Sequence, residues 1–200
     1  MRRRVIPVFA VLACFALCLG ATPALAHPAP LGLRGFWGGV LHPLFVIDHV
    51  MAALALGLLM GRQPQWRWLP PIAFAVGLMG GVAVMMSGAV PRYANETILG
   101  IAVVAGVLVA TAWPLPVRLG MALDAILGTA IALDSPPEVL SVGEANLMLV
   151  GTAIGATAFM IAVWQAARQA RARWAQIAVR AVGSWIAAAA ILALALRLVR

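Results

Sequence analysis

Charged residues are scarce in this 200-residue chain: they make up 10% of it, whereas hydrophobic residues make up 64%. A soluble domain of this length needs a polar surface that such a composition cannot supply. The chain is therefore typical of a membrane protein with several spans. Lysine is absent, so the formal charge of +8 comes from arginines alone. They lie in short gaps between apolar runs and form no basic stripe with interleaved aromatic residues, which argues against nucleic-acid binding.

Cysteine is almost absent too, since Cys14 and Cys18 are the only two and both lie in the first apolar run. They predict neither a disulfide framework nor a cysteine-based metal site. The chain also lacks a Gly-x-x-x-x-Gly-Lys motif for ATP. No nucleophile stands in a recognisable motif with a base and an acid. We therefore expect no enzyme activity and no permanently bound cofactor, and any transport must use a gradient or a separate energy-coupling partner.

Residues 1–26 have the organisation of a secretory signal peptide: an arginine-rich start, an apolar stretch and an Ala-x-Ala sequence that ends at Ala26. Cleavage there makes His27 the first residue of the mature chain, where its α-amino group and imidazole can chelate a metal together. Pro28 has no backbone N–H, which excludes a site built on that amide. The alternatives are an uncleaved first helix and a histidine that is merely exposed.

The remaining sequence, residues 27–200, predicts an all-α single domain: a polytopic membrane bundle of six transmembrane helices. Glycines and Pro43 near the start of the first span predict a kink close to His42. With the mature N-terminus outside, the loops after spans one, three and five carry seven arginines and the opposite side carries four. This bias follows the positive-inside rule and predicts a bacterial inner-membrane protein with a periplasmic mature N-terminus. The expected spans cover about 36–60, 69–88, 93–113, 117–133, 141–164 and 177–198.

The chemistry is concentrated in the first span, which holds His42, Asp48 and His49, and thus two of the three histidines in the chain. Ionisable groups inside a bilayer are costly and mark paths or binding sites. On an ideal helix the two imidazoles share a face but lie roughly 10 Å apart along the axis. Either an unwound turn at Pro43 brings them to one ion, or they are successive stations along a path. Imidazole and carboxylate ligands suit Ni²⁺, Co²⁺ or Zn²⁺.

Other readings of this cluster are a hydrogen-bonded packing motif and a proton relay. A haem carrier is disfavoured because both intramembrane histidines lie on one predicted helix. Three acids further along the chain are weaker candidates for the ion path. Glu96 is equally suited to cap a helix, Asp124 lies in the middle of a span, and Asp134 opens an acidic loop.

The first-span residues resemble a motif of the HupE/UreJ family of small bacterial membrane proteins. They read Gly35-Phe36-x-x-Gly39-x-x-His42-Pro43-x-x-x-x-Asp48-His49, with Val46 where the family has glycine. Pro91-x-x-x-x-Glu96 and Arg180-x-x-Gly183 fit the family as well. The resemblance implies a nickel or cobalt permease that supplies hydrogenase or urease, with the first-span His and Asp residues in the ion path.

A non-transporting membrane protein that assists metalloenzyme maturation is the alternative function. The expected partners are the bilayer, a divalent metal ion and either a second copy of the chain or maturation proteins, but not nucleic acid.

One stretch departs from the family pattern. The family has a second motif, His-Gly-x-Ala-His-Gly-x-Glu, where this chain reads Leu127-Gly128-Thr129-Ala130-Ile131-Ala132-Leu133-Asp134. Both histidines are missing, whereas an acid remains at the last position. Either Asp124 and Asp134 supply oxygen ligands instead, or the affinity and metal preference have changed, or the chain no longer transports nickel. Oxygen ligands favour harder ions.

Overall fold

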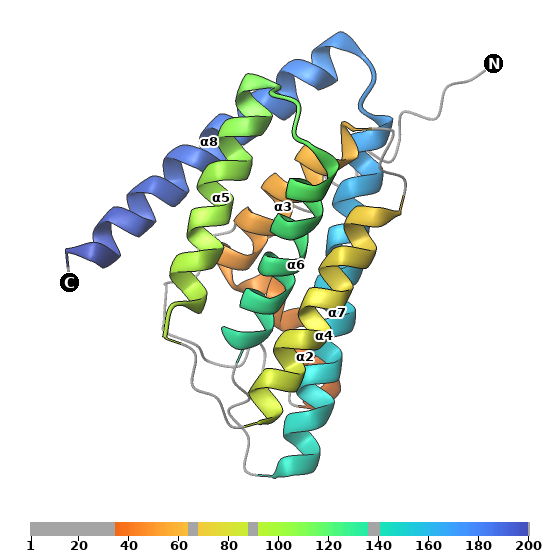
Figure 1. The fold of residues 1–200 in the computed structure, drawn as a ribbon, viewed down its shortest axis with the longest axis vertical. Coiled ribbons are helices and arrows are strands. Elements are labelled where there is room, and N and C mark those ends of the chain that lie inside the picture. Colours follow the sequence, from red (N-terminus) through yellow and green to blue (C-terminus); the bar gives the residue numbers. More distant parts are fainter. Residues whose placement is uncertain (1–34, 64–67, 88–91, 136–140, 200) are drawn as a thin grey trace.

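The computed structural model describes residues 35–63, 68–87, 92–135 and 141–199, and every regular element in them is a helix (Figure 1). The all-α prediction is therefore confirmed for this part of the chain. The expected signal peptide, residues 1–26, and His27 lie outside the described residues. The helices are α2 (Gly35–Phe45), α3 (Ile47–Gly61), α4 (Leu69–Met86), α5 (Ala94–Thr111), α6 (Val117–Leu133), α7 (Val142–Gln169) and α8 (Arg173–Leu198).

The first predicted span is two helices rather than one. The helices α2 and α3 meet at Val46, whose backbone is extended (φ −89°, ψ 107°), and their axes differ by 69°. A kink was expected close to His42, and the break comes four residues after it. Pro43 itself lies inside α2. A β-branched residue such as Val46 readily takes an extended conformation.

In the part of the chain that the structure describes, four helices are long and apolar enough to cross a membrane: α4, α5, α7 and α8. The bent pair of α2 and α3 makes a fifth if it is counted as one span. The helix α6 has only 17 residues, which is near the lower limit of length for a span. The described residues thus form a helical membrane bundle, and the sixth span stays a prediction.

The helices pack in pairs that are not neighbours in sequence: α4 on α6, α2 on α7, and α5 on α8. Glycines make the close approaches. In α4, Gly77 faces the backbone of Ala125, and Thr129 donates a hydrogen bond to the Gly77 carbonyl at 2.8 Å. In α2, Gly39 faces the backbone carbonyl of Met148 in α7. Since lipid is as apolar as the helix surfaces, such close packing replaces the hydrophobic effect as the force that joins the helices.

At the centre of the bundle lies α3, which contacts α5, α6, α7 and α8. Ten of its fifteen residues are buried. Five of the fifteen are Ala or Gly, and the larger Leu56 and Met60 are fully buried. This position places the first turn of α3, which carries Asp48 and His49, where several helix ends meet.

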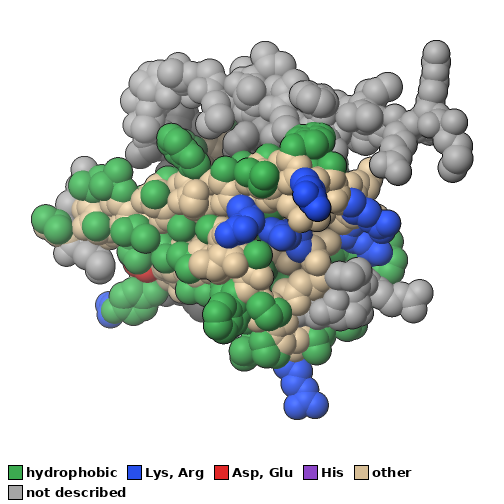
Figure 2. All heavy atoms as spheres, turned by 90° about the horizontal axis from the view of Figure 1, so that it is seen from above, with side chains coloured by type: hydrophobic (Ala, Val, Ile, Leu, Met, Phe, Trp, Pro, Cys, Tyr) green, Lys and Arg blue, Asp and Glu red, His purple; other side chains and the backbone are tan. Residues whose placement is uncertain are grey.

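The two ends of the bundle differ in charge. Of the eight arginines in the described residues, six lie at the end where α3, α5 and α7 finish and α8 begins. Viewed from that end, the molecule shows a gathering of arginine side chains (Figure 2). Asp48, Glu96, Asp134 and Glu144 all lie at the opposite end, close to helix termini. We call these the basic end and the acidic end.

Candidate functional site

Four helix ends meet at the acidic end of the bundle. They are the first turns of α3 and α5 and the last residues of α6 and α8, and they contribute Asp48 and His49, Asn95, Asp134 and Arg197. Residues 85 and 149 positions apart in sequence come into direct contact here. The helices alternate in direction, so these termini reach one end of the bundle together.

One contact in this cluster joins His49 and Asp134. The Nε2 atom of His49 lies 2.9 Å from Oδ2 of Asp134, the residue that ends α6. A carboxylate only accepts hydrogen bonds, so Nε2 carries the proton in this contact. In the neutral imidazole the lone pair is then on Nδ1, which is buried and has no hydrogen-bond partner in the described structure. A carboxylate behind a histidine is the arrangement that orients metal-binding histidines.

Asn95 links the two carboxylates of the site. Its side-chain amide donates to Oδ2 of Asp48 at 2.9 Å and to Oδ2 of Asp134 at 3.4 Å. The other end of the amide, Oδ1, is buried and has no hydrogen-bond partner in the described structure. An amide oxygen and carboxylate oxygens are ligands for hard divalent cations. Neither aspartate is fully buried, since their side chains are 19% and 20% exposed.

Arg197 closes the cluster from the last turn of α8. Its Nη2 atom lies 3.3 Å from Oδ2 of Asp48, and its side chain is 47% exposed. With His49 neutral, the two carboxylates and this guanidinium leave a net charge of −1. The ion pair occupies an oxygen that a bound cation would use.

His42 and His49 lie close together because of the break between α2 and α3. The centroids of their rings are 5.8 Å apart, and the ring planes are inclined by 69°. This spacing is shorter than the separation of roughly 10 Å expected along an ideal helix. The two rings are therefore neighbours, and whether they bind one ion or act in succession along a path stays a prediction.

The other two acids lie differently. Glu96 is in the first turn of α5, next to Asn95, and makes no hydrogen bond among those found in the described residues. Asp124 is fully buried in the middle of α6, and neither of its carboxyl oxygens has a hydrogen-bond partner there. It precedes Asp134 by ten residues, roughly 15 Å along the helix. The structure therefore brings Asp134 to the histidines and leaves Asp124 apart from them.

The cluster is not an assembled metal cage. In the ranges that the structure describes, no three His, Cys, Asp or Glu side chains lie close enough to hold a metal ion together. His49, Asp48 and Asp134 are joined instead by hydrogen bonds and by the ion pair to Arg197. A site through which an ion passes needs weak binding rather than a closed coordination sphere.

Two members of the cluster, Asn95 and Arg197, were not singled out from the sequence as site residues. Asn95 adjoins Glu96 at the start of a span, and a polar residue at that position was a usable signal. Arg197 lies at the end of the last apolar run, where an arginine is explained by topology alone. Nothing in its local sequence points to Asp48.

A comparison with family models matches residues 15–193 to the HupE / UreJ protein family. No curated protein and no solved structure gives a significant match. The matched stretch includes α2 to α7 and most of α8. Of the residues in the cluster, only Arg197 lies outside it. The chain belongs to the HupE/UreJ family, which is associated with the uptake of nickel or cobalt or with metalloenzyme maturation.

Proposed function

We propose that this protein carries a divalent transition-metal ion, nickel or cobalt, across the bacterial inner membrane, and that the ion binds at the cluster of His49, Asp48, Asp134 and Asn95. The acidic end then faces the periplasm and receives the ion, and the basic end faces the cytoplasm. The protein acts as a secondary permease and not as an enzyme. His42 belongs to the same ion path, with His27 as an additional ligand after signal cleavage.

The observation that carries this proposal is the contact between His49 and Asp134 at 2.9 Å. Asp134 holds the imidazole through Nε2, so the lone pair on Nδ1 points away from Asp134. The Nδ1 atom is buried and has no hydrogen-bond partner in the described residues. Such a nitrogen is a ligand for a borderline divalent ion. Asp134, the acid at the last position of the second motif, thus acts through His49 as well as by its own charge.

Charge supports the same site. The four acids at the acidic end attract cations, whereas six of the eight described arginines lie at the other end. An electrostatic gradient of this kind concentrates cations at the end where the site lies. The arginine bias also agrees with the positive-inside rule, which places the basic end in the cytoplasm.

The test is uptake of radioactive Ni²⁺ and Co²⁺ by cells that produce the full chain, compared with the variants His42→Ala, Asp48→Ala and His49→Ala. We expect each variant to reach the membrane in wild-type amounts, measured by immunoblot, and to lose uptake. Zn²⁺ and Mn²⁺ are measured in parallel to define the preferred ion. Wild-type uptake by all three variants would refute the proposed site.

A second function, assistance in metalloenzyme maturation without transport, is favoured by one observation. No group of three metal-binding side chains converges in the described ranges. A strain that lacks the gene separates the two functions. Transport predicts reduced cellular metal, which excess metal in the medium compensates. An accessory role predicts normal cellular metal and a hydrogenase or urease that stays inactive despite the added metal.

A further inference from the structure

The basic end of the bundle contains two neighbouring cavities that the metal site does not use. The first, which we call the basic cavity, has a volume of about 300 Å³ and lies where α3 and α7 end and α8 begins. Three arginines, Arg62, Arg168 and Arg171, line it together with Gln176 and small residues. The second, which we call the apolar cavity, measures about 240 Å³ and lies between the ends of α3 and α5.

Within the described residues, no carboxylate forms an ion pair with the arginines of the basic cavity. The ion pairs found in the described residues involve Asp134 and Asp48, both at the acidic end. Arg168 lies over the ring of Trp164, with 4.8 Å between its guanidinium carbon and the ring centroid, so its charge is held at the cavity wall. Arg62 is half-buried, and its Nη1 atom is buried with no hydrogen-bond partner in the described structure.

Arginines at helix ends also interact favourably with the helix dipole, which accounts in part for Arg62 and Arg168. The dipole does not satisfy a buried guanidinium nitrogen, because a buried donor without an acceptor loses the hydrogen bonds that it makes to water in the unfolded chain. The amide nitrogen of Gln63, next to Arg62, is buried and unpartnered in the same way. Two adjacent donors therefore lack an acceptor, and an anion would supply it.

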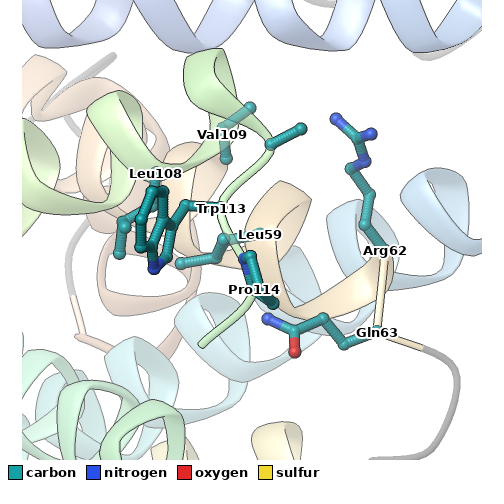
Figure 3. Close-up of a pocket in the computed structure, with 8 residues that line it drawn as sticks. Leu59, Arg62, Gln63, Leu108, Val109, Trp113 and Pro114 are labelled. Atoms are coloured by element: carbon teal, nitrogen blue, oxygen red, sulfur yellow. The ribbon is translucent and has the colours of Figure 1, made fainter. Parts of the chain in front are cut away.

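The apolar cavity indicates that the ligand also has an apolar part. Its walls include Leu59, Leu108, Val109, Trp113 and Pro114, and Arg62 and Gln63 stand on one side of it (Figure 3). Arg62 lines both cavities. A ligand that fills the two together has an anionic group beside an apolar chain. Among molecules present at this depth of a membrane, anionic phospholipids have that composition, and basic pockets between spans bind their headgroups.

We propose that the basic cavity binds the phosphate group of an anionic phospholipid, through Arg62, Arg168 and Arg171, and that an acyl chain of the same lipid lies in the apolar cavity. Arginine suits this role because its planar guanidinium binds phosphate oxygens through two hydrogen bonds. This lipid site is separate from the metal site, since His49 and Arg62 lie at opposite ends of α3, roughly 20 Å apart along the helix. It does not depend on the proposed transport.

The experiment uses the full chain in phosphatidylcholine vesicles that contain a small fraction of phosphatidylglycerol with brominated acyl chains, which quench tryptophan on contact. We expect phosphatidylglycerol to quench more than brominated phosphatidylcholine at the same fraction. The additional quenching by phosphatidylglycerol should be smaller in Trp113→Phe, because Trp113 lines the apolar cavity. Arg62→Gln and Arg171→Gln should each weaken the apparent affinity about tenfold, the effect of one charge-assisted phosphate contact.

The matched control is Arg118→Gln, which removes one exposed arginine from the same end but lines neither cavity. It should keep wild-type affinity for phosphatidylglycerol. An equal loss in Arg118→Gln would show general attraction to a positive surface and overturn the site. Equal quenching by the two brominated lipids would overturn it as well. Arg171 is exposed, so its variant should fold even if Arg62→Gln does not.

A last arm separates a lipid from a free anion. In neutral detergent, phosphatidylglycerol is expected to raise the Tm of the protein, and inorganic phosphate is expected to leave it unchanged. A rise with inorganic phosphate as large as that with phosphatidylglycerol would overturn the assignment to a lipid.

Discussion

At the scale of single residues, Asp134 determines which nitrogen of His49 is available. The hydrogen bond at 2.9 Å places the proton on Nε2, and the lone pair of the neutral ring is therefore on Nδ1. Asp134 also adds negative charge to a cluster that already contains Asp48. In the proposed metal site, this one carboxylate orients a ligand and also attracts the ion.

Replacing the Asp134 carboxylate by an amide of the same shape removes its negative charge with little change in packing. We expect Asp134→Asn to lower the apparent metal affinity about 10–100-fold, the usual consequence of losing a partner behind a metal-binding histidine. The measurement is the concentration dependence of Ni²⁺ uptake in whole cells. Glu144→Gln is the control, because Glu144 is an exposed acid at the same end and contacts the cap of α7 rather than His49. Equal loss in both variants would mean that only the overall charge of this end matters.

In the proposed metal site, Arg197 would compete with the cation for Asp48. The guanidinium lies 3.3 Å from the carboxylate in a half-exposed ion pair, and such pairs stabilise by about 0–1 kcal/mol. Arg197→Gln should therefore improve the apparent metal affinity by up to about fivefold, as measured by uptake at low metal concentration. The matched control is Arg92→Gln, which removes an exposed arginine from the same end. Reduced affinity in Arg197→Gln alone would instead identify Arg197 as a residue that positions Asp48.

At the scale of the helices, glycines decide how closely two spans approach. A Cβ atom on Gly77 would meet the backbone of Ala125 in α6, whereas one on Gly80, three residues further along α4, would meet nothing within 4 Å. The two glycines are in the same helix, and only one faces a partner. This contrast gives a direct measure of what the close approach contributes.

Alanine should lower stability at Gly77 but not at Gly80. Gly77→Ala is expected to destabilise the protein by about 1–3 kcal/mol, because the added methyl group forces α4 and α6 apart. Gly80→Ala is expected to leave stability unchanged or raise it by up to about 1 kcal/mol, because alanine favours the helix. Thermal unfolding in neutral detergent measures both. A Gly77→Ala variant as stable as Gly80→Ala would show that α4 and α6 are further apart than the structure places them.

At the scale of the whole molecule, charge is sorted between the two ends. Six of the eight described arginines lie at the basic end, and four acids lie at the acidic end. An arginine-rich end stays in the cytoplasm according to the positive-inside rule. With that orientation, the proposed cation site and the proposed anionic-lipid site would lie on opposite sides of the membrane.

The orientation is tested with single cysteines at the two ends of α7. With Cys14 and Cys18 changed to Ser, we expect Gly143→Cys to react with a membrane-impermeant maleimide in intact cells. Gln169→Cys should react only after the membrane is opened. Both positions are exposed, and Gly143 has open space around it. The reverse labelling pattern would place the metal site in the cytoplasm and contradict uptake from outside.

Part of the candidate site was accessible from sequence because its residues are adjacent in the chain. His42, Asp48 and His49 stand out as polar groups in an apolar run, and a kink near Pro43 was expected between them. Asp134 was included as a weaker candidate, but its contact with His49 was not predicted. Asn95 and Arg197 were missed, because a polar residue at the end of a span is usually explained by the interface alone.

The sequence by itself determined that the described residues are helical, that several helices are apolar enough to cross a membrane, and where the charges bias the ends. Each of these depends on composition within one segment or on one loop. The tertiary structure decided that α4 packs on α6, α2 on α7 and α5 on α8, and that residues 47, 85 and 149 positions apart meet at the site. Within lipid no difference in hydrophobicity selects a partner helix. The pairing follows from which small-residue surfaces fit together in three dimensions, and only that packing brings Asp134, Asn95 and Arg197 to the start of α3.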